Sequence, residues 1–177
     1  MKKILMLVTS LLISCAAFAE EGQELTTIHG TNIDMKIYDH AMAGAIKDYV
    51  AWGFFDEAAG VAELIVRKYE LTIKTIFTKQ ENGKVGGTIV HTKDGVEYKT
   101  QIEFAGIDSA NKIIKLKIND ELVSVHVVPE SMNESHMVNP TFTAVVAGET
   151  ISYQMGGEGC YGKSMFFAMM ILGAYIH

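Results

Sequence analysis

Apolar and polar positions alternate along most of the chain from Tyr69 to Met155. Successive side chains of a strand point to opposite faces, so this alternation predicts strands with one buried face and one wet face. The pattern predicts seven short strands in succession. The clearest runs cover residues 69–78, 96–104, 114–119, 123–127, 141–147 and 150–155.

The links between these runs favour tight hairpins. Asn82-Gly83 and Asp94-Gly95 adopt positive φ at low cost, as two-residue hairpin turns require. Asn119-Asp120 is a weaker signal of the same kind, and Gly148-Glu149 separates the last two runs. Strands joined so closely are antiparallel neighbours. A sheet of this kind with one wet face needs an apolar cover on the other face.

The segment before these strands shows spacing that fits a helix. Thr31-x-x-Asp34 is similar to a capping box, with Asp in place of the usual Glu or Gln. We expect an amphipathic helix from Ile33 to Ala51, because apolar residues recur at every fourth position. These are Ile37, Ala41, Ala45 and Tyr49, widened by Ile33, Tyr38, Met42, Ile46 and Trp52.

Two further elements are expected before Tyr69. A second helix, from about Asp56 to Lys68, carries Ala59, Ala62, Leu64, Ile65 and Val66. Residues 23–29 are a candidate strand that precedes both helices.

The chain ends in a segment that is apolar on nearly all sides, from Met165 to Ile176. It is too short to span a bilayer and too apolar for an exposed helix, so it must be buried in the core, in a groove or in a partner. A helix is expected, although a last strand covered on both faces fits the same pattern.

The expected fold class is therefore α+β, with N-terminal helices and a C-terminal apolar helix packed on a long antiparallel β-meander. This order of elements resembles the helix-grip arrangement, in which a curved sheet wraps a long helix and leaves a cavity between them. It resembles barrels of the lipocalin kind less closely. Either resemblance implies a ligand cavity under the sheet.

The N-terminus has the features of a secretory signal. Lys2 and Lys3 precede an apolar run from Ile4 to Ile13, and Ala17-Phe18-Ala19 offers small residues to signal peptidase. We expect a signal peptide over residues 1–19, cleavage before Glu20, and a single periplasmic or secreted domain over residues 20–177. Leu12-Ile13-Ser14-Cys15 supports an alternative, a lipoprotein anchored through Cys15.

Charge and cysteine content narrow the function classes. The formal net charge is −6 and becomes more negative once the signal is removed, which argues against nucleic acid and anionic membrane surfaces as partners. Cys160 is the single thiol after the signal, so no internal disulfide is expected. It is either a small buried hydrophobe or a reactive thiol.

One motif suggests nucleotide binding and is rejected. Residues 157–164 match the pattern Gly-x4-Gly-Lys-Ser, in which Lys163 would contact phosphates and Ser164 would hold magnesium. Such loops sit on a parallel sheet with a later magnesium-binding Asp. Here the preceding strands are predicted to be antiparallel, and no acidic residue follows Ser164.

The sequence gives little support for a metal site or a catalytic site. His126, His136, Glu130 and Glu134 lie in or near the polar segment between Pro129 and Pro140, but their spacing matches no metal signature. No motif pairs Cys160 with a histidine base. We therefore predict no cofactor, no metal and no catalytic residue, and we regard enzymatic activity as the less favoured interpretation.

The leading hypothesis is an exported protein that holds an apolar small molecule or lipid between a curved sheet and its helices. Alternatives are a protein-interaction or envelope-structural module, in which the apolar C-terminal segment docks into a partner or a second copy, and, third, an enzyme that uses Cys160. The candidate pocket residues are apolar or aromatic, although ordinary core positions would look the same. They are Met42, Trp52, Phe54, Tyr98, Phe104, Met155, Phe166 and Met169.

Overall fold

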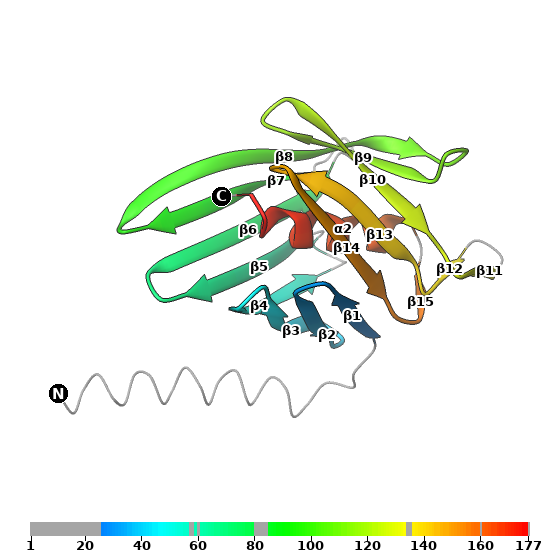
Figure 1. The fold of residues 1–177 in the computed structure, drawn as a ribbon, viewed down its shortest axis with the longest axis horizontal. Helices are drawn as coiled ribbons and strands as arrows, with labels where there is room; N and C mark the ends of the chain where they lie inside the picture. Colours follow the sequence, from blue (N-terminus) through cyan, green and yellow to red (C-terminus); the bar gives the residue numbers. More distant parts are fainter. Residues whose placement is uncertain are drawn as a thin grey trace.

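The computed structural model describes residues 26–56, 59, 61–79, 85–133, 136–159 and 161–176, and the side chains of 159, 161–166 and 79 lie outside that description. The predicted signal sequence, Cys160 and the Asn82-Gly83 turn also lie outside it. The rest of the chain folds as a closed antiparallel barrel around one helix (Figure 1).

Twelve strands form the barrel, in the order β1-β14-β13-β10-β9-β8-β7-β6-β5-β4-β3-β2. Most neighbours in the barrel are also neighbours in the sequence, joined by short turns. The strands are β1 Thr26–Gly30, β2 Ile33–Ile37, β3 Ala41–Ile46, β4 Tyr49–Asp56, β5 Val61–Lys68, β6 Leu71–Lys79, β7 Val85–Lys93, β8 Val96–Asp108, β9 Ile113–Ile118, β10 Glu121–Val128, β13 Thr141–Val146 and β14 Glu149–Met155.

A second, small sheet lies at one end of the barrel. It contains β11 (Ser131–Asn133), β12 (His136–Val138) and β15 (Glu158–Gly159). The polar segment between Pro129 and Pro140 therefore forms a short hairpin, whose second strand pairs with the residues that lead into the C-terminal helix.

The antiparallel pairing and the alternation predicted from the sequence are confirmed. In β13, for example, Phe142, Ala144 and Val146 are buried while Thr141, Thr143 and Val145 are not. Asp94-Gly95 and Asn119-Asp120 adopt positive φ and connect hairpins, as their composition predicts.

The prediction of an α+β fold with N-terminal helices is wrong. Residues 33–51, expected as a helix, form β2, β3 and the start of β4, and residues 61–68 of the second expected helix form β5. Thr31-x-x-Asp34 is not a helix cap, because Thr31 and Asn32 form the turn between β1 and β2.

The error has a physical reason. An interval of four residues is even, so residues spaced by four share one face of a strand as well as one face of a helix. The turn that breaks this region at Lys47 contains no glycine, although Lys47 has φ 58°. The segment therefore lacked the turn dipeptides, such as Asp94-Gly95, that marked the later hairpins.

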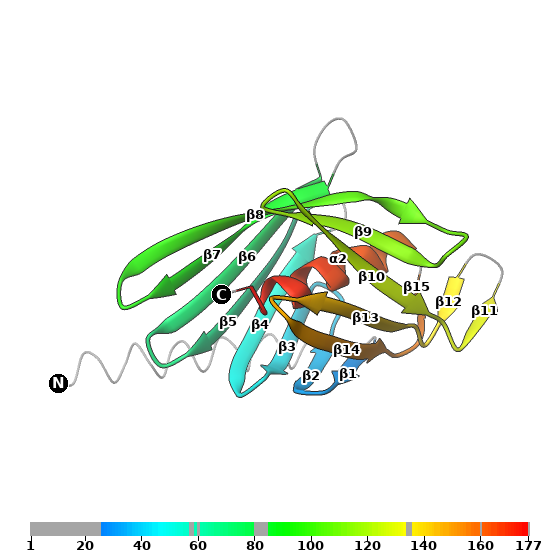
Figure 2. The ribbon, with the colours of Figure 1, turned by 45° about the horizontal axis from the view of Figure 1, so that its top comes forward.

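The one helix described is α2, Tyr161–Gly173, and it runs through the inside of the barrel (Figure 2). Every residue from Phe167 to Tyr175 is buried. Phe167 packs edge-on against Phe55 of β4 with 5.6 Å between ring centroids, and Gly173 lies against Thr75 of β6. The C-terminal segment is thus the hydrophobic core around which the strands close.

The structure around residues 157–164 differs from the structure that surrounds a phosphate-binding loop. Gly157 has φ 76°, and β15 then pairs antiparallel with β12. All strand pairs in the described part of the chain are antiparallel, so the parallel sheet that carries such loops is not found there.

Candidate ligand-binding site

A pocket of about 600 Å³ lies across β3, β4 and β5, and most of its larger lining residues are apolar or aromatic. We call it the aromatic pocket. Its lining residues are Tyr38, His40, Ala41, Met42, Ala43, Trp52, Gly53, Phe54, Phe55, Asp56, Glu63 and Ile65.

The strand register explains how this pocket forms. Ala43 pairs with Trp52, and Trp52 pairs with Ile65, so these three side chains stand in a row on one face of the sheet. Their neighbours Met42, Ala51 and Leu64 are buried in the core, so the row points outward. Small alanines beside a large tryptophan leave a hollow on the outer face of the barrel, and the core residues Met42 and Phe55 also line the pocket.

A second row completes the wall. Ala41 pairs with Phe54, and Phe54 pairs with Glu63. Phe54 is 47 % exposed, a large fraction for a phenylalanine on a strand. An outward aromatic side chain over a hollow is the kind of surface that buries apolar area when a ligand binds.

Polar groups stand at the rim of the aromatic pocket and are tied to the fold. Glu63 pairs with Lys74 of β6 at 3.0 Å, and Asp56 accepts a hydrogen bond from the Ala59 backbone N–H at 2.9 Å. The ring of His40 lies against Phe55, and its backbone carbonyl accepts the Phe55 N–H. The pocket therefore combines an apolar body with a few fixed polar groups, as small-molecule sites do.

A larger hollow of about 840 Å³ lies at the end of the barrel where α2 finishes. We call it the mouth pocket. It is lined by His91, Tyr98, Thr100, Ile118, Asn119, Glu121, Leu122, Val123, Val145, Val146, Ala147, Gly148 and Ile176.

The mouth pocket exists because two strands separate. β10 pairs with β13 only through residues 126–128 and 141–143, so the first part of β10 has no strand partner on that side within the described chain. The β9–β10 hairpin therefore diverges from β13 toward its tip. The polar residues His91, Asn119 and Glu121 are among those that line the mouth pocket.

Tyr175 closes the interior just below this mouth. The Lys47 ammonium lies 4.6 Å from the centre of its ring and 3.0 Å from the Glu149 carboxylate. Burial, followed by the charge of Glu149, raises the pKa of Tyr175 to about 12. Its phenol is therefore uncharged at physiological pH, and its ring is buried in the core just after the end of α2.

Tyr153 of β14 lies near Tyr175 in the core. Burial, and then the neighbouring Tyr175, raise the pKa of Tyr153 far above its usual range. Within the described residues neither phenol oxygen has a hydrogen-bond partner. Neither tyrosine is suited to act as a base.

The structure separates the residues proposed from the sequence. Met42, Trp52 and Phe54 line the aromatic pocket, whereas Tyr98 lines the mouth pocket. Met155 and Met169 belong to the buried core, and Phe104 is half-buried against it. Phe166 lies in α2, and its side chain is outside the described part.

Sequence reasoning missed Tyr38, His40, Glu63 and Ile65. The signal was present as apolar residues at every second position on the outward faces of β3, β4 and β5. It becomes readable only when residues 33–68 are taken as strands and not as helices.

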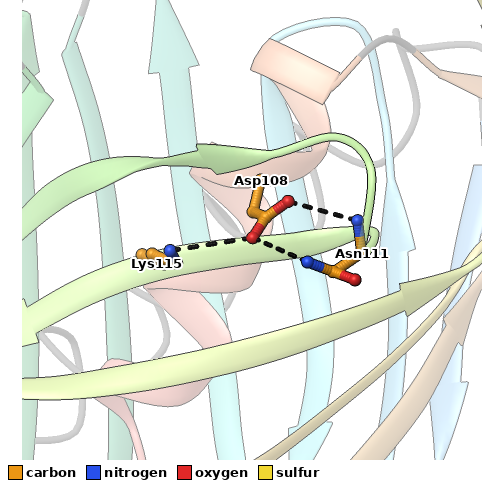
Figure 3. A network of polar contacts seen from close by, with 3 residues as sticks. All are labelled: Asp108, Asn111 and Lys115. Carbon is orange, nitrogen blue, oxygen red and sulfur yellow. Dashed lines mark hydrogen bonds and ion pairs between the residues drawn. The ribbon is translucent and has the colours of Figure 1, made fainter.

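The polar clusters elsewhere serve the fold. At the β8–β9 turn, the Asp108 carboxylate accepts hydrogen bonds from the Asn111 side chain at 3.0 Å and its backbone N–H at 3.2 Å (Figure 3). Lys115 stands 3.8 Å away. The Asn111 hydrogen bonds hold the pKa of Asp108 below its usual range, with Lys115 adding to the effect.

Two other kinds of feature are absent from the described residues. No group of three His, Cys, Asp or Glu side chains there is arranged to hold a metal ion. In the same residues, no helix combines the length and apolar character needed to cross a membrane.

Comparison of the chain with protein-family models, with curated proteins and with solved structures gave no match.

Proposed function

We propose that this protein is a small exported binding protein whose apolar ligand, a small molecule or a lipid chain, lies in the aromatic pocket. A closed antiparallel barrel is compatible with binding a lipid or small molecule. The observation that carries the proposal is the hollow between Ala43 and Trp52, walled by Phe54 and Ile65 on the outer face of the sheet.

The expected position of the ligand changes with the fold. The sequence hypothesis placed it between the sheet and covering helices, but α2 occupies that space with its own side chains. A ligand in the barrel interior would have to displace Phe167, Met170 and their neighbours from the core. Binding on the outer face requires no such displacement.

The volume and lining of the aromatic pocket suit an apolar molecule of modest size. A hollow of about 600 Å³ falls in the ordinary range for small-molecule sites, which are mostly apolar with a few polar groups. Glu63 is paired with Lys74, so the rim offers a hydrogen-bonding pair and not a lone charge. A ligand with an apolar body and a small polar end fits this arrangement.

Trp52 is the single tryptophan of the chain and provides a direct test. We expect an apolar dye such as N-phenylnaphthylamine to quench Trp52 emission by energy transfer when titrated into the protein. Ala43→Leu fills the hollow beside Trp52 and should weaken binding about tenfold or more, because the added methylenes take the ligand's place.

Ala45→Leu is the matched control, since Ala45 lies on the same face of β3 but outside the aromatic pocket. It should bind the dye as the wild type does. Equal loss in both variants, or saturable binding without energy transfer from Trp52, would contradict this location. Native mass spectrometry of the purified protein should then identify any co-purified molecule.

The alternative in which the C-terminal segment docks into a partner finds less support. It requires Phe167–Tyr175 to be available at the surface, and these residues are buried inside the barrel.

Export is a separate part of the proposal. N-terminal sequencing of the protein recovered from outside the cytoplasm should begin at Glu20, whereas labelling of Cys15 by palmitate would establish the lipoprotein form.

A further inference from the structure

The first five residues of β8, Val96 to Thr100, form a sheet edge in the barrel wall. β7 pairs with them on one side, but β9 pairs with β8 only from Ile102 onward. Both views show the β7–β8 hairpin projecting beyond the tip of the β9–β10 hairpin (Figures 1 and 2). This stretch has no strand partner on its other side in the described part of the chain.

The direction of the backbone groups along this edge follows from Gln101. Its carbonyl accepts the Asn119 N–H at 3.0 Å, and its own N–H donates to the Asn119 side chain at 3.0 Å. Both backbone groups of Gln101 thus point toward β9. Because antiparallel strands alternate in this respect, the N–H and C=O groups of Glu97 and Lys99 point the same way, into the open edge.

The side chains on the edge are also available. Val96 is 51 % exposed and Tyr98 is 59 % exposed, both on the face that the core occupies further along β8. Glu97 and Lys99 are exposed on the opposite face. Exposed edges with free backbone groups and apolar side chains are templates for an added strand.

We propose that two copies of this protein associate edge to edge through Val96–Thr100, forming an antiparallel β8–β8 pair with its two-fold axis at Tyr98. The axis lies there because Tyr98 is the centre of the free stretch, which ends at the Asp94-Gly95 turn and at the Asn119 contact to Gln101. The interface is isologous, so each contact occurs twice.

This register satisfies both backbone and side chains. Glu97 stands opposite Lys99 of the second copy, and Lys99 stands opposite its Glu97. Their backbone groups face each other, so the two positions form hydrogen-bonded pairs, and their side chains form two ion pairs. Tyr98 meets its counterpart in the closer, non-hydrogen-bonded pair, where side chains pack best.

Shifted registers lose this complementarity. An axis at Glu97 sets two carboxylates directly opposite each other, and an axis at Lys99 does the same with two ammonium groups. Like charges directly opposite are destabilising. The sequence Val-Glu-Tyr-Lys-Thr is therefore self-complementary only about its central tyrosine, which favours a second copy over an unrelated strand as the occupant.

The test exchanges the charges at Glu97 and Lys99 and measures dimerisation by sedimentation velocity over a range of protein concentrations. The wild type should dimerise reversibly. Glu97→Lys alone and Lys99→Glu alone each create two like-charge pairs, and each should weaken the dimer about tenfold or more. An equimolar mixture of these two variants, and the double exchange in one chain, restore both pairs and should dimerise again.

Glu70→Lys and Lys112→Glu make the same changes of net charge at exposed turns away from this edge and should leave the dimer unchanged. Wild-type protein that stays monomeric at high concentration would overturn the proposal. A dimer that is indifferent to both single exchanges, or that the mixture fails to restore, would also overturn it. The aromatic pocket lies on other strands, so the dye titration followed by Trp52 emission tests the pocket independently of the dimer.

Discussion

At the scale of single residues, the turns between strands decide how the barrel closes. Positive φ occurs at nine non-glycine residues of the described chain, and five of these are Asn or Asp, which tolerate that conformation best. Lys47, Tyr69, Lys112 and Ala147 adopt it without such an advantage. The turns at Asp94 and Asn119-Asp120 were readable from the sequence, whereas the turn at Asn32 was not recognised and the turns at the other four residues carry no such signal.

The β13–β14 turn offers a prediction from this strain. Ala147 has φ 51° and Gly148 has φ 79°, the dihedrals of a turn for which Asn-Gly is the preferred pair. Ala147→Asn should raise the free energy of unfolding by about 0.5–1 kcal/mol, because Asn adopts positive φ at lower cost. Urea denaturation measures the change, and Ala147→Val should shift the midpoint the opposite way. A midpoint lowered by Ala147→Asn would contradict this view of the turn.

The carboxylate at the β8–β9 turn gives a second prediction. Hydrogen bonds from Asn111 hold the pKa of Asp108 below its usual value. This contribution to stability is therefore complete above the pKa of the unfolded chain and is lost as the pH falls through the lower folded value. Asn111→Ala should raise the pKa of Asp108 toward its ordinary value in a carboxylate-detected NMR titration. An unchanged titration curve would contradict this assignment to the Asn111 side chain.

At the scale of elements, periodicity alone could not separate strands from helices before Tyr69. Ile37, Ala41 and Ala45 are spaced by four, and this interval fits both structures. The actual boundary signals were the turns at Thr31-Asn32 and Lys47, neither of which contains glycine. The later hairpins were predictable because Asp94-Gly95 and Asn119-Asp120 are recognisable turn dipeptides in the sequence.

The contact between α2 and the barrel wall gives a third prediction. A Cβ atom on Gly173 would lie 2.9 Å from the Thr75 side-chain oxygen and 3.1 Å from its methyl carbon. Gly173→Ala should therefore destabilise the protein by about 1–3 kcal/mol, although alanine favours helix formation. Thermal or urea unfolding measures this loss.

The double variant Gly173→Ala with Thr75→Ala removes the atoms in conflict and serves as the control. If the contact is the cause, the double variant should be more stable than the sum of the two single changes predicts. Strict additivity would show that the cost of Gly173→Ala arises elsewhere in α2.

At the scale of the whole molecule, the C-terminal segment lies inside the barrel and provides the core that its strands enclose. The sequence indicated that this segment had to be buried, but it did not indicate what would surround it. Of the site residues proposed from sequence, Trp52 and Phe54 point outward to a hollow whereas Met155 and Met169 fill the core. That difference depends on strand register, which composition cannot supply.

Hydrogen exchange of the backbone amides from Phe167 to Tyr175, in α2 and the turn that follows it, tests the central claim most directly. If the helix is the permanent core, these amides should exchange only through global unfolding, and their protection should increase when the apolar dye saturates the native protein. Exchange faster than global unfolding, or protection lost on dye binding, would mean that the helix leaves the barrel and that the ligand takes its place.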